Sequence, residues 1–303
     1  MSELFGLFLN NLLPIFLIAG AGYLLSRNLG VNSRPISQLS FYIFSPCLVF
    51  VLITKNELGN TEILQMMFYP AVLALLVGSI TYLVGRAIKL ERRLLIATVL
   101  AAIFMNAGNY GLPVNLFAFG ESALAHASLF FVMMSILTYT VGVVIASMGS
   151  YSLLESLVGL YKIPAIYGVL LAFLFTNLNL TLPLPVDRTV TLLSNAAIPS
   201  MLILLGMQLQ KVQWNGYPRA LALAGTMRLL FAPLLAAGLS LLFGIAGPAR
   251  QAYILEAAMP TAVFTTILAT EYDLEPAFIT TAVLTTTLIS PLTLTPLLAY
   301  LGG

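Results

Sequence analysis

The sequence predicts an all-α membrane protein in which ten transmembrane helices form two inverted five-helix repeats. Three observations lead to this fold class. Of the 303 residues, 60% are hydrophobic and 8% are charged; apolar segments long enough to span a bilayer recur along the chain; and prolines recur at a nearly constant spacing between the two halves.

The composition excludes several classes of protein. A soluble domain has about 25% charged residues, and this chain, with a mean hydropathy of +1.00, carries too few charges to cover a water-facing surface. The 13 basic residues are scattered and form no patch for nucleic acid. With one cysteine, Cys47, and one histidine, we expect neither a disulfide framework nor a metal cluster, and no cofactor.

The apolar segments are predicted to be helices, each near the 20 residues that a membrane helix needs. Continuous apolar stretches such as Ala71–Val84 differ from the short alternating strands of a barrel. The first segment lacks a basic leading region and is too long for a cleavable signal peptide. The ten predicted segments are 4–25, 36–54, 63–86, 93–119, 123–147, 162–180, 189–209, 217–243, 249–270 and 276–300.

The distribution of Lys and Arg predicts the orientation. Nine of these residues lie in the connections after odd-numbered segments and three in the connections after even-numbered ones, while Arg228 lies within segment 8. Because cytoplasmic loops are enriched in Lys and Arg, we expect the odd connections in the cytoplasm and both termini outside, in a multi-pass protein of the cell inner membrane. The connections are too short to hold a soluble domain.

Proline spacing predicts an internal repeat, with residues 1–150 as the first five-helix unit and 151–303 as the second. Each unit has an odd number of helices, so the two must have opposite orientations, as in many secondary transporters. The pairs, in order along the helices, are Pro14 and Pro164, Pro46 and Pro199, Pro70 and Pro218, and Pro113 and Pro260.

Two segments at equivalent positions of the repeats carry helix-breaking residues near their midpoints. The fourth contains Gly108, Gly111 and Pro113 within 104–115, and the ninth contains Pro260. Irregular backbone at membrane depth is tolerated where it lines a cavity or is buried, and the start of a half-helix offers free N–H groups to an anion. We expect the two segments to cross at Pro113 and Pro260 and to bind an anion there. The alternative is a pair of proline-kinked helices in which asparagines only cap the backbone.

These segments also carry a family resemblance. Asn109-Tyr110-Gly111-Leu112-Pro113, Ala257–Val263 followed by Ala269–Tyr272, and Ser45-Pro46 with Leu48 and Phe50 resemble the auxin efflux carrier family, over essentially the whole chain. The resemblance implies a fold like that of bile acid and sodium/proton transporters. Helices 1, 2, 6 and 7 would form a dimerising scaffold, and helices 3–5 and 8–10 a mobile transport domain with crossed helices 4 and 9. It further implies carboxylate binding at the crossing, with Asn109 as the matching side chain. The chain lacks the large central cytoplasmic loop of the long plant members.

Single polar residues complete the predicted site. Glu256, an acid within segment 9, is expected either to couple transport to an ion or a proton or to form a buried ion pair with Arg228. For Arg228 itself, the ion pair is the favoured role. We expect His126 at the interface, Asn10, Asn11 and Asn195 to bond between helices, and the acidic run Glu271, Asp273 and Glu275 in a solvated loop. The predicted substrate-binding residues are Asn106, Asn109, Tyr110, Gly111, Pro113, Val114, Asn115, Met259, Pro260, Thr261, Ser45 and Tyr139; those for ion or proton coupling are Glu256 and Arg228, with Na⁺ near Glu256 as the one metal considered.

The expected function is secondary active transport of a small organic anion, a carboxylate such as an auxin-like compound or a dicarboxylate, by an elevator-type mechanism. The coupling ion is H⁺ or Na⁺, or absent. The expected partners are the anion, the bilayer and a second copy of the chain bound through the scaffold, with no nucleic acid. The alternatives are a sodium-coupled bile-acid-like symporter, a channel, or an intramembrane enzyme, for which neither an H-E-x-x-H motif nor paired intramembrane aspartates are present.

Overall fold

The computed structural model describes residues 2–56, 60–147, 163–209 and 216–302, and within these ranges it is helical with no strand. Seven helical stretches are long and apolar enough to cross a membrane, which confirms an all-α, multi-pass membrane protein. A shorter apolar helix, α10 (Pro164–Asn177), adds to them. The seven stretches are Leu4–Leu29, Ser33–Lys55, Asn60–Ala87, Ala107–Ala146, Leu184–Leu209, Pro218–Leu242 and Pro276–Leu301.

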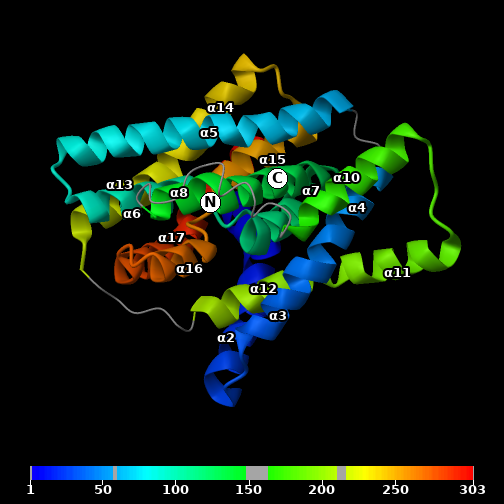
Figure 1. Cartoon of the computed structure of the whole chain (residues 1–303), viewed down its shortest axis with the longest axis horizontal. Coiled ribbons are helices and arrows are strands. Elements are labelled where there is room, and N and C mark those ends of the chain that lie inside the picture. Colours follow the sequence, from blue (N-terminus) through cyan, green and yellow to red (C-terminus); the bar gives the residue numbers. More distant parts are fainter. Residues whose placement is uncertain (1, 57–59, 148–162, 210–215, 303) are drawn as a thin grey trace.

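The first half of the chain consists of α-helices (Figure 1) and four short π-helical segments, written η. In order, its elements are α1 (Ser2–Leu7), η1 (Phe8–Leu12), α2 (Leu13–Leu29), α3 (Ser33–Leu39), η2 (Ser40–Phe44), α4 (Ser45–Lys55), α5 (Asn60–Ala87), α6 (Arg92–Ile103), η3 (Ala107–Gly111), α7 (Leu112–Leu137), η4 (Thr138–Gly142) and α8 (Val143–Ala146).

The second half begins, within the described residues, at α10. The elements that follow are α11 (Leu184–Asn195), α12 (Ala197–Leu209), α13 (Pro218–Thr226), η6 (Met227–Phe231), α14 (Ala232–Leu242), α15 (Gly247–Ala257), α16 (Phe264–Glu271) and α17 (Pro276–Leu301). The predicted repeat boundary at residues 150 and 151 lies outside the described residues, as do Lys162 and Lys211 of the orientation count.

Predicted segments 4 and 9 are each divided into two helices. The chain is extended between α6 and η3, and irregular between α15 and α16. The predicted junction between segments 4 and 5 falls inside α7, where Gly120 has a φ of +77° and the helix changes direction. Glycine suits this position because other residues rarely adopt a positive φ.

Four of the π-helical segments owe their geometry to proline. Pro14, Pro46, Pro113 and Pro233 each occupy the second residue of the α-helix that follows η1, η2, η3 and η6. Proline has no N–H, and its ring clashes with the preceding turn. The residue before each proline donates its N–H to the carbonyl five residues back, as Ser45 does to Ser40. The wider turn accommodates the ring without ending the helix.

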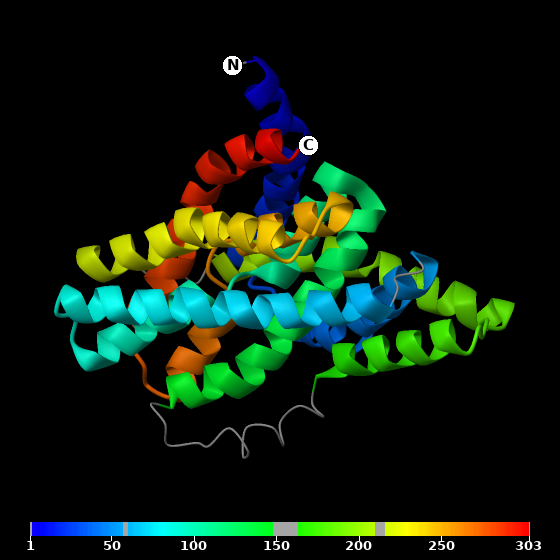
Figure 2. The same cartoon turned by 90° about the horizontal axis from the view of Figure 1, so that it is seen from above.

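Two pairs of helices from opposite halves pack closely, α2 with α12 and α4 with α10 (Figure 1). Glycines make this possible. A Cβ atom on Gly22 would lie 2.1 Å from the Ile203 carbonyl oxygen, and one on Gly206 would lie 1.6 Å from that of Ala19. Gly168 faces the Pro46 carbonyl oxygen in the same way, at 2.7 Å. Elsewhere α13, η6 and α14 lie along α5, so that the two halves interlock on this side too (Figure 2).

Candidate functional site at the helix crossing

The two interrupted helices cross where their backbones are extended. Met105 and Thr261 form an antiparallel bridge. The Asn106 N–H donates to the Pro260 carbonyl over 2.8 Å, and the Ala262 N–H donates to the Phe104 carbonyl over the same distance. The expectation that Pro113 marks the crossing is therefore wrong. Pro113 lies in the first turn of α7, beyond η3, because the π-helical segment accommodates it without a break.

Arg228 joins the two half-helices that end at the crossing. Its side chain is fully buried, and its guanidinium donates to the carbonyls of Ala102 (2.5 Å) and Ile103 (3.0 Å) at the end of α6 and to that of Ala257 (2.6 Å) at the end of α15. Helix C-termini carry partial negative charge, so one cation neutralises both ends. Among the described residues no carboxylate lies within ion-pair distance of Arg228. The favoured pairing with Glu256 is therefore wrong.

A pocket of about 440 Å³ opens beside the crossing. It lies between α3, η2, α4 and α12 on one side and the crossing, η4 and α16 on the other. Of the predicted substrate residues, Asn106, Asn109, Ser45 and Tyr139 line it. Its other polar lining residues are Ser33, Arg34, Ser37, Gln38, Ser40, Tyr42, Ser135, Thr138 and Gln208. Arg34 is the one charged residue in this lining, and no carboxylate takes part.

Two polar atoms of the pocket wall are buried and have no hydrogen-bond partner among the described residues. They are Nδ2 of Asn106 and Oγ of Ser40. The neighbouring Asn109 donates through Nδ2 to Oε1 of Gln208 over 3.3 Å, across the two sides of the pocket. Buried polar groups are nearly always hydrogen-bonded. Unpaired donors next to the first turn of a helix suit an acceptor-rich ligand such as a carboxylate.

A second polar cluster lies on the other side of η3, around Glu256. This residue of α15 is fully buried, and its Oε1 accepts a hydrogen bond from Nδ2 of Asn115 (3.0 Å). Its Oε2 has no hydrogen-bond partner in the part of the chain that the structure describes. Asn115 also donates to the Gly111 carbonyl (2.9 Å), and its Oδ1 is likewise unpartnered. A Cβ atom on Gly111 would lie 2.2 Å from Oε2 of Glu256. The cluster thus presents two unpaired acceptor oxygens, which a proton or a cation satisfies.

The remaining predicted substrate residues do not line the pocket. The Tyr110 hydroxyl is 3.1 Å from Oγ of Ser290 in α17, and Thr261 bonds through its N–H to Thr286 and through its hydroxyl to the Ala101 carbonyl. These contacts fix the crossing against its neighbours. Gly111, Pro113, Val114, Asn115, Met259 and Pro260 are also absent from the lining.

Polar residues expected to be structural lie away from the pocket. His126 is buried in the protein; its Nδ1 lies 2.7 Å from the Ser122 carbonyl oxygen and its Nε2 3.9 Å from Glu62. Asn11 is buried in η1, while Asn10 and Asn195 are exposed.

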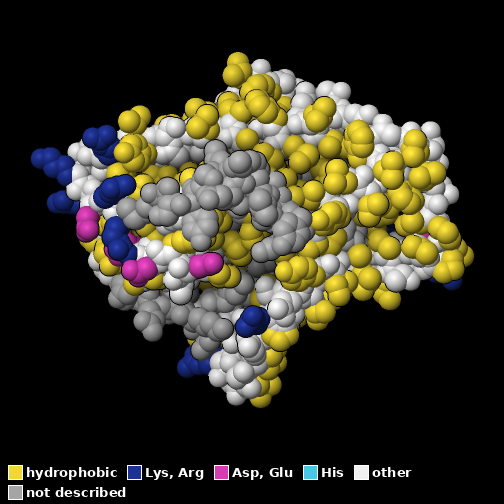
Figure 3. All heavy atoms as spheres, viewed as in Figure 1, with side chains coloured by type: hydrophobic (Ala, Val, Ile, Leu, Met, Phe, Trp, Pro, Cys, Tyr) yellow, Lys and Arg dark blue, Asp and Glu magenta, His cyan; other side chains and the backbone are white. Residues whose placement is uncertain are grey.

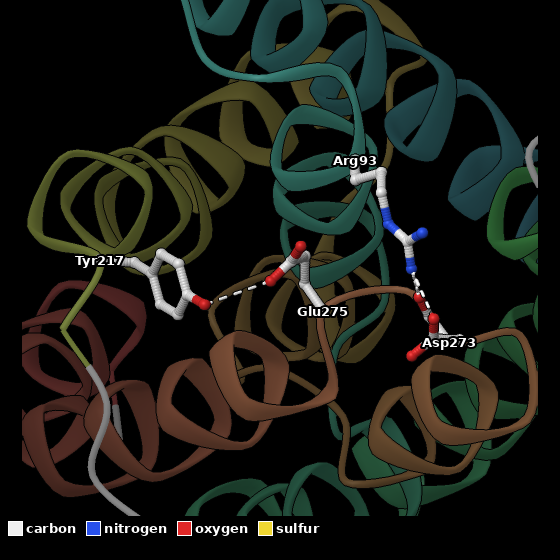
Figure 4. Close-up of polar contacts among 4 residues, drawn as sticks. All are labelled: Arg93, Tyr217, Asp273 and Glu275. Carbon is white, nitrogen blue, oxygen red and sulfur yellow. Dashed lines mark hydrogen bonds and ion pairs between the residues drawn. The ribbon is translucent and has the colours of Figure 1, made fainter.

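The acidic loop between α16 and α17 is held by two neighbouring elements. Arg93 of α6 pairs with Asp273 over 2.9 Å, and the hydroxyl of Tyr217, at the start of α13, donates to Glu275 over 3.2 Å (Figure 4). Both acidic residues have positive φ angles, +49° and +47°. The loop therefore joins α6, α13 and α17 at one end of the molecule.

Sequence reasoning missed Ser40, Gln208 and Arg34. Gln208 offered a signal, because it is a polar side chain at the end of the apolar run 201–207, where such residues are rare. Ser40 lies among ordinary polar residues near a helix start, and Arg34 counted only toward the orientation. Neither has a local pattern that distinguishes it.

Comparison with known proteins supplies the context for this geometry. Residues 7–298 match the family described as membrane transport protein. An uncharacterized transporter of Methanocaldococcus jannaschii is 29% identical over 86% of each chain. A Rhizobium meliloti protein provisionally named a malonate transporter is 24% identical over 98% of this chain and 96% of its own. Auxin efflux carrier component 6 of Arabidopsis thaliana is 29% identical over 40% of this chain and 21% of its own length.

Proposed function

The chain belongs to the membrane transport protein family, and from this premise we propose that it is a secondary active transporter of a small organic anion bearing a carboxylate. The observation that carries the proposal is the pocket at the crossing. Its wall contains a buried, unpaired amide donor on Asn106, a half-helix start at η3, one arginine, and no acid. The names of the relatives, a malonate transporter and an auxin efflux carrier, fit a carboxylate cargo.

The electrostatics of the crossing favour an anion. Arg228 neutralises the negative ends of α6 and α15, whereas the N-terminal end of η3 faces the pocket. The positive end of a helix dipole is then left uncompensated next to the ligand. A carboxylate bound by Asn106, Asn109 and Ser40 supplies both the missing hydrogen bonds and the negative charge.

Glu256 and Asn115 supply the coupling site in this proposal. Their unpaired oxygens lie on the far side of η3 from the pocket, so one short segment contacts both the substrate and the coupling ion. When H⁺ or Na⁺ binds Glu256, the buried carboxylate loses its unpaired charge, and η3 and α7 adjust through Asn115 and Gly111. Arg228 contributes by fixing the ends of the half-helices, one of which, α15, carries Glu256.

The arrangement of the pocket supports an elevator mechanism. One wall comes from α3, η2, α4 and α12, the helices of the proposed scaffold, and the other from the crossing, η4 and α16, which belong to the proposed transport domain. Arg228 and the loop at Asp273 tie elements of both halves into that domain. The matched pairs α2–α12 and α4–α10 support two inverted five-helix repeats, 1–150 and 151–303, and a homodimer through the scaffold.

Counterflow in proteoliposomes tests the function. Vesicles preloaded with one member of a carboxylate panel, malonate and indole-3-acetate included, are expected to accumulate labelled external substrate, as a carrier does and a channel does not. Asn109→Ala is expected to weaken substrate binding by roughly 10- to 150-fold, the value of one hydrogen bond to a charged group. Asn195→Ala is the matched control, because Asn195 is exposed on α11. Absence of counterflow for every carboxylate would overturn the proposal.

The coupling role of Glu256 has its own test. Glu256→Gln keeps the size of the side chain and removes its charge. We expect well-folded variant protein to bind the anion but to lose the dependence of transport on pH or Na⁺. Loss of Na⁺ dependence alone would favour a sodium symporter resembling bile acid carriers, and loss of pH dependence alone a proton-coupled carrier. Unchanged dependence on both would remove Glu256 from the mechanism.

A further inference from the structure

A second cavity lies on the outside of the crossing, away from the substrate pocket. It is an open groove of about 830 Å³ between α5, α6 and the η4–α8 segment, and nearly all of its lining is apolar. Ile103, which lies against Gly78 of α5, and Phe104 of the crossing are among its lining residues. Successive residues of extended backbone point to opposite faces, and accordingly Phe104 lines this groove while Met105 lines the substrate pocket.

The groove has the length of one lipid leaflet. Along α5 its lining runs from Ala71 to Leu83, a rise of about 18 Å at 1.5 Å per residue. Half of a bilayer's hydrocarbon core is about 15 Å thick. The length of the groove therefore suits a single extended acyl chain that passes the crossing at Ile103 and Phe104.

Among the described residues that line the groove, the one charged side chain lies at the end where α5 turns into α6. Arg92 lines that end, and the guanidinium of Arg86 lies 6.0 Å from the ring of Tyr82, another lining residue. Figure 3 shows several Lys and Arg side chains over this end of the molecule, with Asp and Glu side chains beside them. Arg93 is engaged by Asp273, whereas neither Arg86 nor Arg92 pairs with a carboxylate of the described residues. No acid is among the described residues that line the groove.

We propose that this groove binds one anionic phospholipid, with an acyl chain along α5 and the phosphate held by Arg86 and Arg92. Guanidinium groups bind phosphate oxygens with matched geometry, and the ring of Tyr82 suits the interface between headgroups and hydrocarbon. The acyl chain then packs on Phe104, whose carbonyl accepts the hydrogen bond from Ala262 at the crossing. The bound lipid supports the crossing from the face opposite the substrate.

Native mass spectrometry of the purified full-length protein tests the proposal, with phosphatidylglycerol and phosphatidylcholine of identical acyl chains as the probes. We expect the phosphatidylglycerol adduct to be retained over the phosphatidylcholine adduct. The double variant Arg86→Gln/Arg92→Gln should lower phosphatidylglycerol binding by roughly fivefold for each guanidinium removed, and leave phosphatidylcholine binding unchanged. Both residues are exposed, so the fold tolerates the change. Arg219→Gln, an exposed arginine outside the groove, is the control.

A second variant tests the groove itself. Ser79 is an exposed lining residue of α5, and Ser79→Trp fills the space that the acyl chain needs. It should reduce the adducts of both lipids. Equal retention of the two lipids by the unmodified protein, or full retention of phosphatidylglycerol by the double arginine variant, would overturn the proposal. So would a change of oligomeric state in Ser79→Trp with lipid binding intact, since that result would assign the groove to a second copy of the chain.

Discussion

The contact between Gly111 and Glu256 allows a sharp prediction, because it links η3 to the proposed coupling acid. Gly111 has helical angles, φ −64° and ψ −49°, so alanine strains no backbone there. Its Cβ, however, would lie 2.2 and 2.5 Å from the two carboxylate oxygens of Glu256. The carboxylate has to move, and the hydrogen bond from Asn115 is lost.

The expected cost of Gly111→Ala follows from these contacts. Overpacking of a buried site costs about 1–3 kcal/mol, and an unpaired buried amide costs about 1–3 kcal/mol more. The higher helix propensity of alanine stabilises the helix and offsets about 1 kcal/mol of this destabilisation. The net destabilisation is therefore about 1–5 kcal/mol. In a Glu256→Ala background the clash is absent, and the same substitution should be neutral or stabilising by up to about 1 kcal/mol.

The double-mutant cycle is read from unfolding midpoints in detergent, with wild type, both single variants and the double variant measured together. Gly238→Ala is the matched control, since Gly238 lies within α14 with no atom near its would-be Cβ; it should be neutral or slightly stabilising. If Gly111→Ala lowers the free energy of unfolding equally with and without the Glu256 carboxylate, the contact between Gly111 and Glu256 does not restrict this position. That result would contradict the proposed link between η3 and the coupling site.

Three further predictions concern the crossing, the scaffold and the topology. Arg228→Met should leave three buried carbonyls unpaired, at a cost of about 1–3 kcal/mol each, and should lower the unfolding midpoint more than Arg228→Lys, which keeps the charge. Equal midpoints for wild type and Arg228→Met would refute the role of Arg228. Gly206→Leu should prevent α12 from packing on α2, because the new side chain would require the Ala19 backbone to move. Gly20→Ala on α2 meets no atom and should be tolerated, and gel filtration should show folded protein for this variant alone. In a Cys47→Ser background, a membrane-impermeant maleimide should label Glu121→Cys on intact cells and Glu91→Cys only after permeabilisation. The reverse labelling pattern would contradict the expectation that both termini lie outside.

Much of the candidate site follows from local patterns. Apolar length predicts helices because each membrane helix satisfies its own backbone. Gly108, Gly111 and Pro113 indicated an interruption because their backbone limits are properties of single residues. Asn106 and Asn109 are predicted because their amides offer hydrogen-bond donors to a carboxylate, and both line the pocket.

Other features depend on which distant segments meet. Composition and local patterns were enough to predict an all-α membrane protein with two interrupted helices. The position of the crossing at Met105 and Thr261, within four residues of the Ile103 and Ala257 carbonyls that Arg228 binds, follows from the tertiary structure. Glu256 and Arg228 are opposite charges within 30 residues, and proximity favoured an ion pair. The carbonyls at the ends of α6 and α15 hold Arg228 instead, because partial charges of helix ends converge only when helices from both halves cross. Ser40 and Gln208 line the pocket for a similar reason, because tertiary packing brings together segments that no local sequence pattern connects.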